Sequence, residues 1–152
     1  MSMDIEVEAL RRVSIFQDVE LAKLRLLAFI SKRMRFQPGE HVCTQGETGD
    51  SAFVIMNGQA DVVVRTTQGE RVVASLGESD IVGEIAVLCD VPRTATVTAT
   101  SDLTVLAVSK ENFLKLVREF PEMGLGIMRV LAHRLEKTTR DLAELRTSLP
   151  EG

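Results

Sequence analysis

With 152 residues and a formal net charge of −4, the chain is long enough for one domain with a substantial core and too short for two comfortable ones. Its basic residues are scattered apart from Lys32, Arg33 and Arg35, a cluster typical of a solvated strand edge, which argues against nucleic acid as a partner. The two cysteines lie far apart without metal-ligand spacing, and no apolar run resembles a signal peptide or a membrane span. We therefore expect a single domain over residues 1–152, located in the reducing cytoplasm and not in a membrane.

Two short helices are expected at the N-terminus. Residues 4 to 13 and 19 to 30 carry apolar residues at three- and four-residue spacing, which predicts helices with one buried face. Asp18 is placed to cap the second helix, because a carboxylate can accept hydrogen bonds from the unpaired N–H groups of a helix start. Residues 1–31 are therefore predicted to form an N-terminal helical segment.

A β-rich region follows, in which the spacing of apolar residues changes to two. Between residues 34 and 108 the sequence is rich in Val and Thr and is interrupted by turn sequences such as Asn57-Gly58, in which glycine permits a positive φ. Short strands joined by tight turns predict a small barrel of the jelly-roll type over residues 32–109. The expected fold class is α+β, mainly β: a jelly-roll-like β-roll flanked by N-terminal helices and a long C-terminal helix.

This architecture raises the alternative of a metal-dependent enzyme, because some jelly-roll oxygenases hold a metal through histidines and a carboxylate. His41 and His133 are the only histidines, one on a predicted strand and one on a predicted helix, without a partner at ligand spacing. No serine lies in a nucleophile elbow, and neither Cys43 nor Cys89 has a histidine–acid pair. Cys89 could sense redox state, although an inert, buried or half-buried thiol is the commoner case. We expect no catalytic residue, no metal, no cofactor and therefore no enzymatic activity.

The segment from residue 82 to residue 97 contains groups suited to a cyclic phosphodiester and its ribose. Gly83 lets the backbone approach a ligand, and a short helical turn after it would offer free N–H groups and a positive dipole end to an anion. Arg93 can add a planar, two-pronged guanidinium to the same phosphate. Glu84 can accept a hydrogen bond from a ribose 2′-hydroxyl. The alternative is that Glu84 and Arg93 form an ordinary surface ion pair beside a glycine turn.

The sequence Gly-Glu-Ile-Ala followed by Pro-Arg-Thr-Ala-Thr-Val resembles the phosphate-binding cassette of the cyclic-nucleotide-binding domain family. The resemblance extends over about residues 10 to 146. It implies that Glu84 holds the 2′-hydroxyl, that Arg93 holds an equatorial phosphate oxygen, and that backbone N–H groups add further donors. The ligand-binding residues implied within this cassette are Gly83, Glu84, Ile85, Ala86, Arg93, Thr94 and Ala95.

Two helices are expected in the C-terminal segment, residues 110–147. Ser109 is placed as the N-cap of the first, which runs to about Glu119, and Pro121 begins the second. Spacings of three and four along the second helix define a heptad seam, which consists of Met128, Leu131, Leu135, Thr138, Leu142 and Leu145. The seam can pack against the protein's own barrel or form a parallel coiled coil between two subunits, and the spacing alone favours neither.

Thr138 is the polar residue of this seam, and a buried hydroxyl needs a hydrogen-bond partner. Residues 132–139 resemble the long dimerisation helix of the catabolite-activator members of the family. That resemblance implies that Thr138 contacts the base from its own subunit and Thr139 contacts it from the other. Because the chain has no Trp and no Tyr, leucines, Met128 or Arg134 must cover the base. The alternative is that Thr138 sets register or bonds its own helix backbone.

The identity of the nucleotide depends on three hydroxyls. Thr94 follows the cassette arginine, a position where a hydroxyl is typical of cGMP-preferring kinases, whereas Thr138 and Thr139 favour adenine. We expect cAMP in preference to cGMP. The sequence stops where a helix-turn-helix domain would begin in the activator proteins, so we expect no specific DNA binding by this chain.

The function expected from these features is that of a cyclic-nucleotide sensor. As a homodimer, it would transmit ligand binding through its C-terminal helix to an unidentified protein partner or a fused effector. The alternative is a ligand-free dimerisation or docking module of the same fold.

Overall fold

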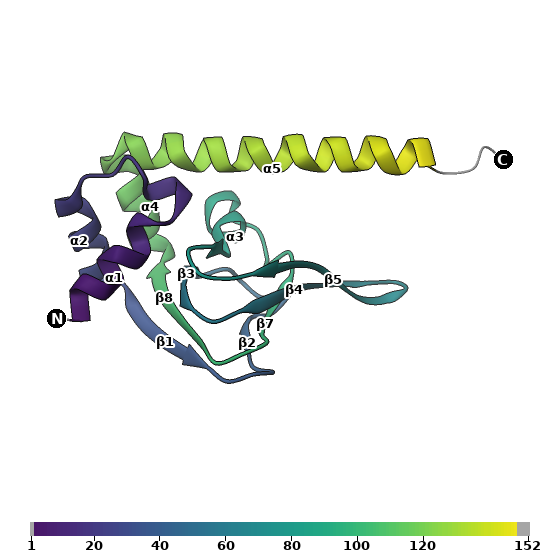
Figure 1. Cartoon of the computed structure of the whole chain (residues 1–152), viewed down its shortest axis with the longest axis horizontal. Helices are drawn as coiled ribbons and strands as arrows, with labels where there is room; N and C mark the ends of the chain where they lie inside the picture. The colour runs from purple at the N-terminus through teal and green to yellow at the C-terminus, as the bar shows by residue number, and fades with distance from the viewer. Residues whose placement is uncertain (1, 149–152) are drawn as a thin grey trace.

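The computed structural model describes the backbone of residues 2–148 and the side chains of residues 4–84 and 86–147. Within this range, helices lie at both ends of the chain and strands lie between them (Figure 1). The helical elements are α1 (Ser2–Arg11), the 3-10 helix η1 (Ser14–Phe16), α2 (Leu21–Ile30), α3 (Glu84–Cys89), α4 (Lys110–Glu119) and α5 (Pro121–Ser148). The strands are β1 (Lys32–Phe36), β2 (His41–Cys43), β3 (Ser51–Asn57), β4 (Ala60–Thr66), β5 (Gly69–Leu76), β6 (Ile81–Val82), β7 (Thr96–Ala99) and β8 (Leu103–Ser109).

The strands form two antiparallel sheets with the orders β1-β8-β3-β6 and β2-β7-β4-β5. Successive side chains of a strand point to opposite faces, so Phe53 and Ile55 of β3 pack toward the second sheet while Val54 packs away from it. Phe53 and Ile55 share a core with Val97 and Ala99 of β7, which closes the two sheets into a roll. Because β3 is covered on both faces, it reads in the sequence as a continuous apolar run and not as an alternation.

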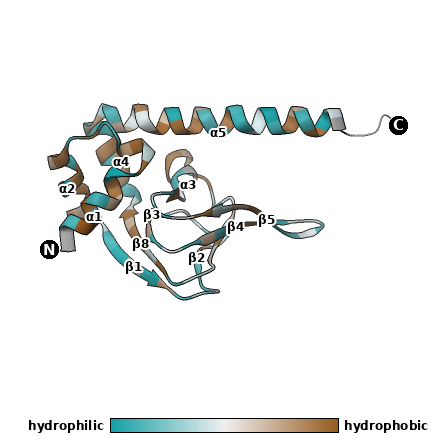
Figure 2. Cartoon of the chain, in the orientation of Figure 1, coloured by the Kyte–Doolittle hydropathy of each residue, from teal (hydrophilic) through white to brown (hydrophobic). Residues whose placement is uncertain are grey.

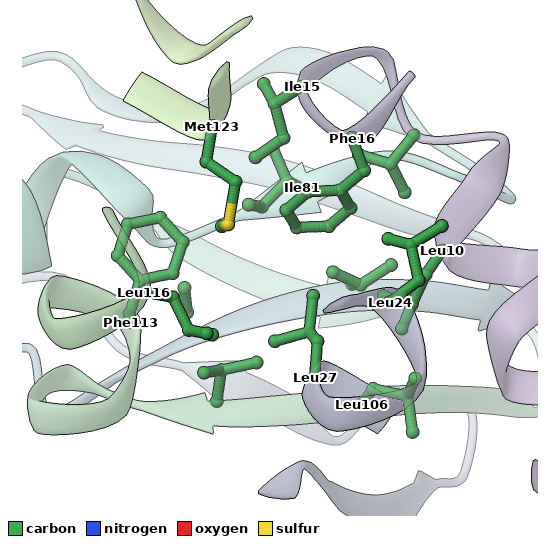
Figure 3. Close-up of a cluster of buried hydrophobic side chains, with 14 of the residues drawn as sticks. Leu10, Ile15, Phe16, Leu24, Leu27, Ile81, Leu106, Phe113, Leu116 and Met123 are labelled. Atoms are coloured by element: carbon green, nitrogen blue, oxygen red, sulfur yellow. The ribbon is translucent and has the colours of Figure 1, made fainter. Parts of the chain in front are cut away.

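A second core lies between the helices and the outer face of the first sheet. Figure 3 shows side chains of η1, α2, α4 and α5 converging on this sheet, and those labelled include Phe16, Leu24, Leu27, Leu106, Phe113, Leu116 and Met123. Most of these side chains are almost completely buried, and burying a side chain of this size contributes about 1.5–3 kcal/mol. This core ties the N-terminal helices, α4 and the beginning of α5 to the roll.

Helix α5 is held at its beginning and exposed along the rest of its length. Met123 and Ile127 are buried, and a Cβ added at Gly126 would lie 2.5 Å from the backbone oxygen of Ile15, so α5 and η1 are in direct backbone contact. From residue 132 to residue 147 every side chain is exposed. In Figure 1 this part of α5 extends away from the N-terminal helices and over α3 and the β4–β5 hairpin.

The fold class predicted from the sequence is confirmed: a β-roll flanked by N-terminal helices and a long C-terminal helix. The predicted start of α4 is also confirmed, since Ser109 Oγ accepts a hydrogen bond from the backbone N–H of Asn112 at 3.2 Å. The basic cluster at Lys32 and Arg33 lies on β1, an edge strand, and is exposed as expected.

One predicted cap is wrong. Helix α2 begins at Leu21, and the residue before it, Glu20, makes no side-chain cap bond. The Asp18 carboxylate instead accepts a hydrogen bond from Arg129 of α5 at 3.2 Å. An exposed carboxylate near a helix start can thus form an ion pair with a cation that is distant in sequence instead of capping the helix.

The heptad seam of α5 does not pack as a whole against the barrel. Leu131 packs partly against the helical core, but Met128, Leu135 and Leu142 are 61%, 68% and 53% exposed. Figure 2 shows hydrophobic residues recurring along the outer part of α5. Thr138, which was predicted to be buried in the seam, is exposed in this single chain.

Candidate ligand-binding pocket

A cavity of about 410 Å³ lies between the roll, α3 and α5. Its floor is mainly apolar and comes from strands of the second sheet and from the β6–α3 segment. Polar and charged groups enter from the loop after α3 and from the exposed part of α5. The lining residues are Cys43, Val62, Ala74, Leu76, Ile81, Val82, Gly83, Glu84, Ala86, Arg93, Thr94, Ala95, Val97, Arg134 and Lys137.

Arg93 is buried at one end of the cavity, with only 5% of its surface exposed. Its Nη1 donates to the backbone oxygen of Gly83 at 3.1 Å, and its Nη2 donates to that of Ser51 at 2.8 Å. Nη2 also lies 3.7 Å from Asp50 Oδ1, and the guanidinium carbon lies 5.4 Å from the centre of the Phe53 ring. Two carbonyls use two of the five N–H donors, so the group is fixed in place and keeps donors for an anion.

Gly83 shapes the same end of the cavity. Its φ of +82° is in the left-handed region, which glycine adopts without strain. A Cβ at this position would collide with Arg93 Nη1, so glycine is required for the close approach of the guanidinium as well as for the turn. Helix α3 starts directly after it, and the N–H groups of the first turn have no partner within the helix. Arg93 and this turn therefore present donors at the same place.

Glu84, the first residue of α3, is also buried, with 5% of its surface exposed. Its carboxylate accepts a hydrogen bond from Arg134 Nη1 of α5, while the Arg134 side chain remains 47% exposed. A buried carboxylate without such a partner would carry a large desolvation cost. The alternative of a surface ion pair between Glu84 and Arg93 is wrong: both residues are buried, and Glu84 is paired with α5 instead.

The structure places the other predicted cassette residues on the same side of the cavity. Ala86 is buried, Ala95 is half-buried and Thr94 is exposed, and all three line the cavity. The backbone of Ile85 belongs to the first turn of α3. Both ends of the predicted cassette segment, residues 82–86 and 93–97, therefore contribute to the lining of the cavity.

The two threonines predicted on α5 lie elsewhere. Thr138 and Thr139 are exposed and are not among the residues that line the cavity of this single chain. Thr139 Oγ1 donates to the backbone oxygen of Leu135 at 2.8 Å, so it bonds its own helix. Their predicted contacts with a base stay predictions.

The sequence reasoning missed the apolar floor of the cavity and two lining residues that carry functional groups, Lys137 and Cys43. Lys137 lies three residues after Arg134, so both side chains share one face of α5, and this spacing was the available signal. Cys43 of β2 reaches the cavity because β2 pairs with β7, next to the cassette. Burial raises the pKa of the Cys43 thiol, which keeps it neutral. Cys89, by contrast, is exposed and not buried or half-buried as the sequence suggested.

The remaining candidates for chemistry are not assembled into a site. His41 Nδ1 lies 3.0 Å from Thr98 Oγ1 on the roll, and His133 is exposed on α5. Among the described residues, no group of three or more His, Cys, Asp or Glu side chains could hold a metal ion. Within the same residues, none of the helices combines the length and apolar character needed to cross a bilayer.

Comparison with known proteins identifies the family. A model of the cyclic nucleotide-binding domain matches residues 33–120, which is more than half of the chain. The chain therefore belongs to the cyclic nucleotide-binding domain family, and the resemblance predicted from the cassette is confirmed.

The chain is similar to regulatory proteins of this family. A CRP-like cAMP-activated global transcriptional regulator of Mycobacterium tuberculosis is 30% identical over 139 residues, and a cAMP-dependent protein kinase regulatory subunit of Yarrowia lipolytica is 37% identical over 108 residues. These alignments cover 91% and 71% of this chain but 62% and 28% of the two relatives. The chain thus spans less than two thirds of the length of either relative.

Solved structures show the same architecture. The catabolite activator protein of Thermus thermophilus superposes with a TM-score of 0.81 at 25% identity, covering 88% of this chain and 63% of that one. The N-terminal domain of a transcriptional regulator from Streptomyces coelicolor superposes with a TM-score of 0.70 at 26% identity, covering 95% of this chain and 99% of that one.

Proposed function

We propose that this chain is a non-enzymatic sensor that binds a cyclic nucleotide in the pocket beneath α5, with cAMP preferred over cGMP. The observation that carries the proposal is the buried Arg93 guanidinium, held by two backbone carbonyls beside Gly83 and the start of α3. A cyclic phosphate at this end of the cavity would accept hydrogen bonds from Arg93 and from the N–H groups of Ile85 and Ala86.

The ribose and the base would occupy the rest of the cavity. With the phosphate at Arg93, the ribose 2′-hydroxyl can donate to Glu84, the first residue of α3. The base then extends over the apolar floor formed by residues such as Val62 and Leu76, which suits an aromatic ring. Adenine is supported by the names of the two curated relatives, which both refer to cAMP. Thr138 and Thr139 would add to this preference only in the proposed dimer, because neither lines the cavity of the single chain.

Signal transmission would run through α5. Arg134 of this helix forms an ion pair with Glu84. A ligand that binds Glu84 would weaken or rearrange this ion pair and so change how the exposed part of α5 is held. A ligand can shift the helix only by as much as it binds one helix position more tightly than another. The effector would be a partner protein or a fused domain that contacts α5.

A homodimer through α5 forms part of the proposal. Met128, Leu135 and Leu142 are exposed at heptad spacing, and exposed leucines in this pattern are typical of a coiled-coil seam. A parallel pair of helices would bring Thr139 of each subunit toward the other subunit's pocket. Dimerisation would also allow the two sites to influence each other's affinity.

Light scattering at high micromolar concentration tests this part separately. We expect twice the monomer mass for the wild type and the monomer mass for Leu135→Glu, which places a charge in the seam. Lys115→Glu on α4 is an exposed control off the seam and should keep the wild-type mass. A monomeric wild type, with and without nucleotide, would refute the dimer.

Isothermal titration calorimetry tests the binding proposal. The protein is refolded to remove any ligand carried through purification, then titrated with cAMP and cGMP in separate runs, because the chain lacks tryptophan for a fluorescence assay. We expect saturable binding at micromolar or lower Kd, with cAMP binding more tightly.

The second candidate function, a docking module without a ligand, is favoured by the same exposed seam. It predicts no heat and no saturation with either nucleotide, from protein shown to be folded by circular dichroism. It also predicts that protein partners bind α5 equally well with and without nucleotide.

A further inference from the structure

Lys137 is the cavity-lining cation that the proposed function leaves without a role. Arg93 is held by the carbonyls of Gly83 and Ser51, and Arg134 is paired with Glu84. Among the residues that the structure describes, no hydrogen bond or ion pair involves the Lys137 ammonium group, although the residue lines the cavity. Its donors are therefore free for a ligand.

The position of Lys137 indicates which part of a nucleotide it would meet. It follows Arg134 by three residues, which is about 4.5 Å further along the axis of α5. In Figure 1 this direction leads from α3 toward the β4–β5 hairpin, whose Val62 and Ala74 line the same cavity. With phosphate at Arg93 and ribose at Glu84, the part of the ligand that lies beneath Lys137 is the base.

An ammonium group is a donor without an acceptor, and purines differ in what they offer it. Guanine carries a carbonyl oxygen at position 6 next to the N7 acceptor, whereas adenine carries an amino group there, which is itself a donor. A lysine at this edge gains a hydrogen bond with guanine that it cannot form with adenine.

We infer that Lys137 reads position 6 of the base and favours 6-oxo purines, so that it narrows the preference for cAMP over cGMP. This inference rests on the proposed nucleotide site and adds a selectivity-determining residue to it. Thr94, by contrast, is predicted to bond the 2-amino group of guanine. The two effects can be separated with cyclic IMP, whose base has the 6-oxo group and N7 but no 2-amino group.

The test measures the Kd of cAMP, cGMP and cyclic IMP for the wild type and three variants. Lys137→Met keeps the length of the side chain and removes its donors, and Lys137→Arg keeps a donor. Lys115→Met removes the same charge from an exposed position on α4 that does not line the cavity. Far-ultraviolet circular dichroism verifies that each variant is folded.

We expect Lys137→Met to weaken cyclic IMP and cGMP by about fivefold each and cAMP by less than twofold, the size of one partly solvated, charge-assisted hydrogen bond. Lys137→Arg should retain most of the wild-type ratio, and Lys115→Met should leave all three affinities unchanged. An equal loss for all three nucleotides would overturn the inference, because it would mean that Lys137 only attracts the phosphate charge. Unchanged affinities in Lys137→Met would overturn it as well. Failure of the wild type to bind any of the three would instead contradict the proposed function itself.

Discussion

The two charged walls of the pocket are built in different ways. On the cassette wall, Arg93 and Glu84 are each 5% exposed, and backbone carbonyls hold the guanidinium in place. On the α5 wall, Arg134 and Lys137 are exposed side chains on a helix whose buried contacts lie near its beginning. The first wall is fixed by buried contacts within the roll, whereas the second stands on a stretch of helix whose side chains are all exposed. We therefore expect the cassette to determine affinity for the phosphate and α5 to determine selectivity and output.

The largest effect is expected from breaking the cassette wall. Arg93→Ala should weaken cAMP binding roughly a hundredfold, or about 3 kcal/mol, because a charge-assisted pair with the phosphate is lost. Arg93→Lys keeps the charge but loses the planar fork, and should recover only part of this affinity. Calorimetric titration of folded variants measures both. Near-wild-type affinity in Arg93→Ala would remove the phosphate-binding role from this residue.

A smaller effect is expected at the buried start of α5, where two neighbouring glycines make a matched pair. At Gly126 a Cβ would meet the Ile15 backbone oxygen at 2.5 Å, whereas at Gly124 its nearest contact is Val117 Cγ1 at 3.7 Å. Gly126→Ala should lower the free energy of unfolding by about 1–3 kcal/mol through overpacking. Gly124→Ala should raise it by up to about 1 kcal/mol through helix propensity.

Urea denaturation of the two glycine variants distinguishes tight packing of α5 on η1 from a loosely attached helix. Equal stabilisation by both alanines would contradict the tight contact. Because neither glycine touches Arg93 or Glu84, any change in cAMP affinity in Gly126→Ala would report on the position of α5 and not on the cassette.

The smallest effect concerns the ion pair between α2 and α5. Lys23 Nζ donates to Glu122 Oε1 at 2.7 Å and lies 4.6 Å from the centre of the Phe120 ring. The hydrogen bond from Lys23 lowers the pKa of Glu122 below its ordinary value of 4.5. A lowered pKa in the folded state means that the stabilisation is present above the ordinary pKa and is lost as the pH falls through the folded value.

Thermal denaturation as a function of pH measures this contribution. Glu122→Gln should have a slightly lower Tm than the wild type at pH 7, and the difference should disappear on acidification from about pH 5 to about pH 3. Glu119→Gln, an exposed change on α4, serves as the control and should follow the wild-type curve. A constant difference between Glu122→Gln and the wild type across this range would exclude the carboxylate as its cause.

The contrast between the two walls also explains what the sequence could predict. Gly83, Glu84 and Arg93 lie within one short segment, so a turn residue, a helix start and a returning guanidinium could be placed together without knowledge of the rest of the fold. In the structure all three line one cavity, while their roles toward a ligand stay predictions. The cap at Ser109 was equally local, since the donor and the acceptor are three residues apart.

The α5 wall depends on long-range packing, which residue spacing does not specify. Periodicity identified a seam on α5 but not which surface each face of the helix would meet. Packing against η1 turns Arg134 and Lys137 to the cavity and leaves Leu135 outside it. The spacing from Arg134 put Lys137 on the same helix face, but the tertiary packing is what places that face at the cavity. The Asp18 cap was wrong for the same reason, because its partner Arg129 lies at the other end of the chain.

The most direct test of this account is hydrogen–deuterium exchange with and without saturating cAMP, because one experiment measures amide exchange in both the cassette wall and the α5 wall. The account predicts slower exchange of the amides in residues 83–95, where Ile85, Ala86 and Thr94 would donate to the phosphate, and a smaller decrease in residues 132–140 of α5. Unchanged exchange in residues 83–95, under conditions where calorimetry shows cAMP to be bound, would contradict the claim that the cassette binds the nucleotide phosphate.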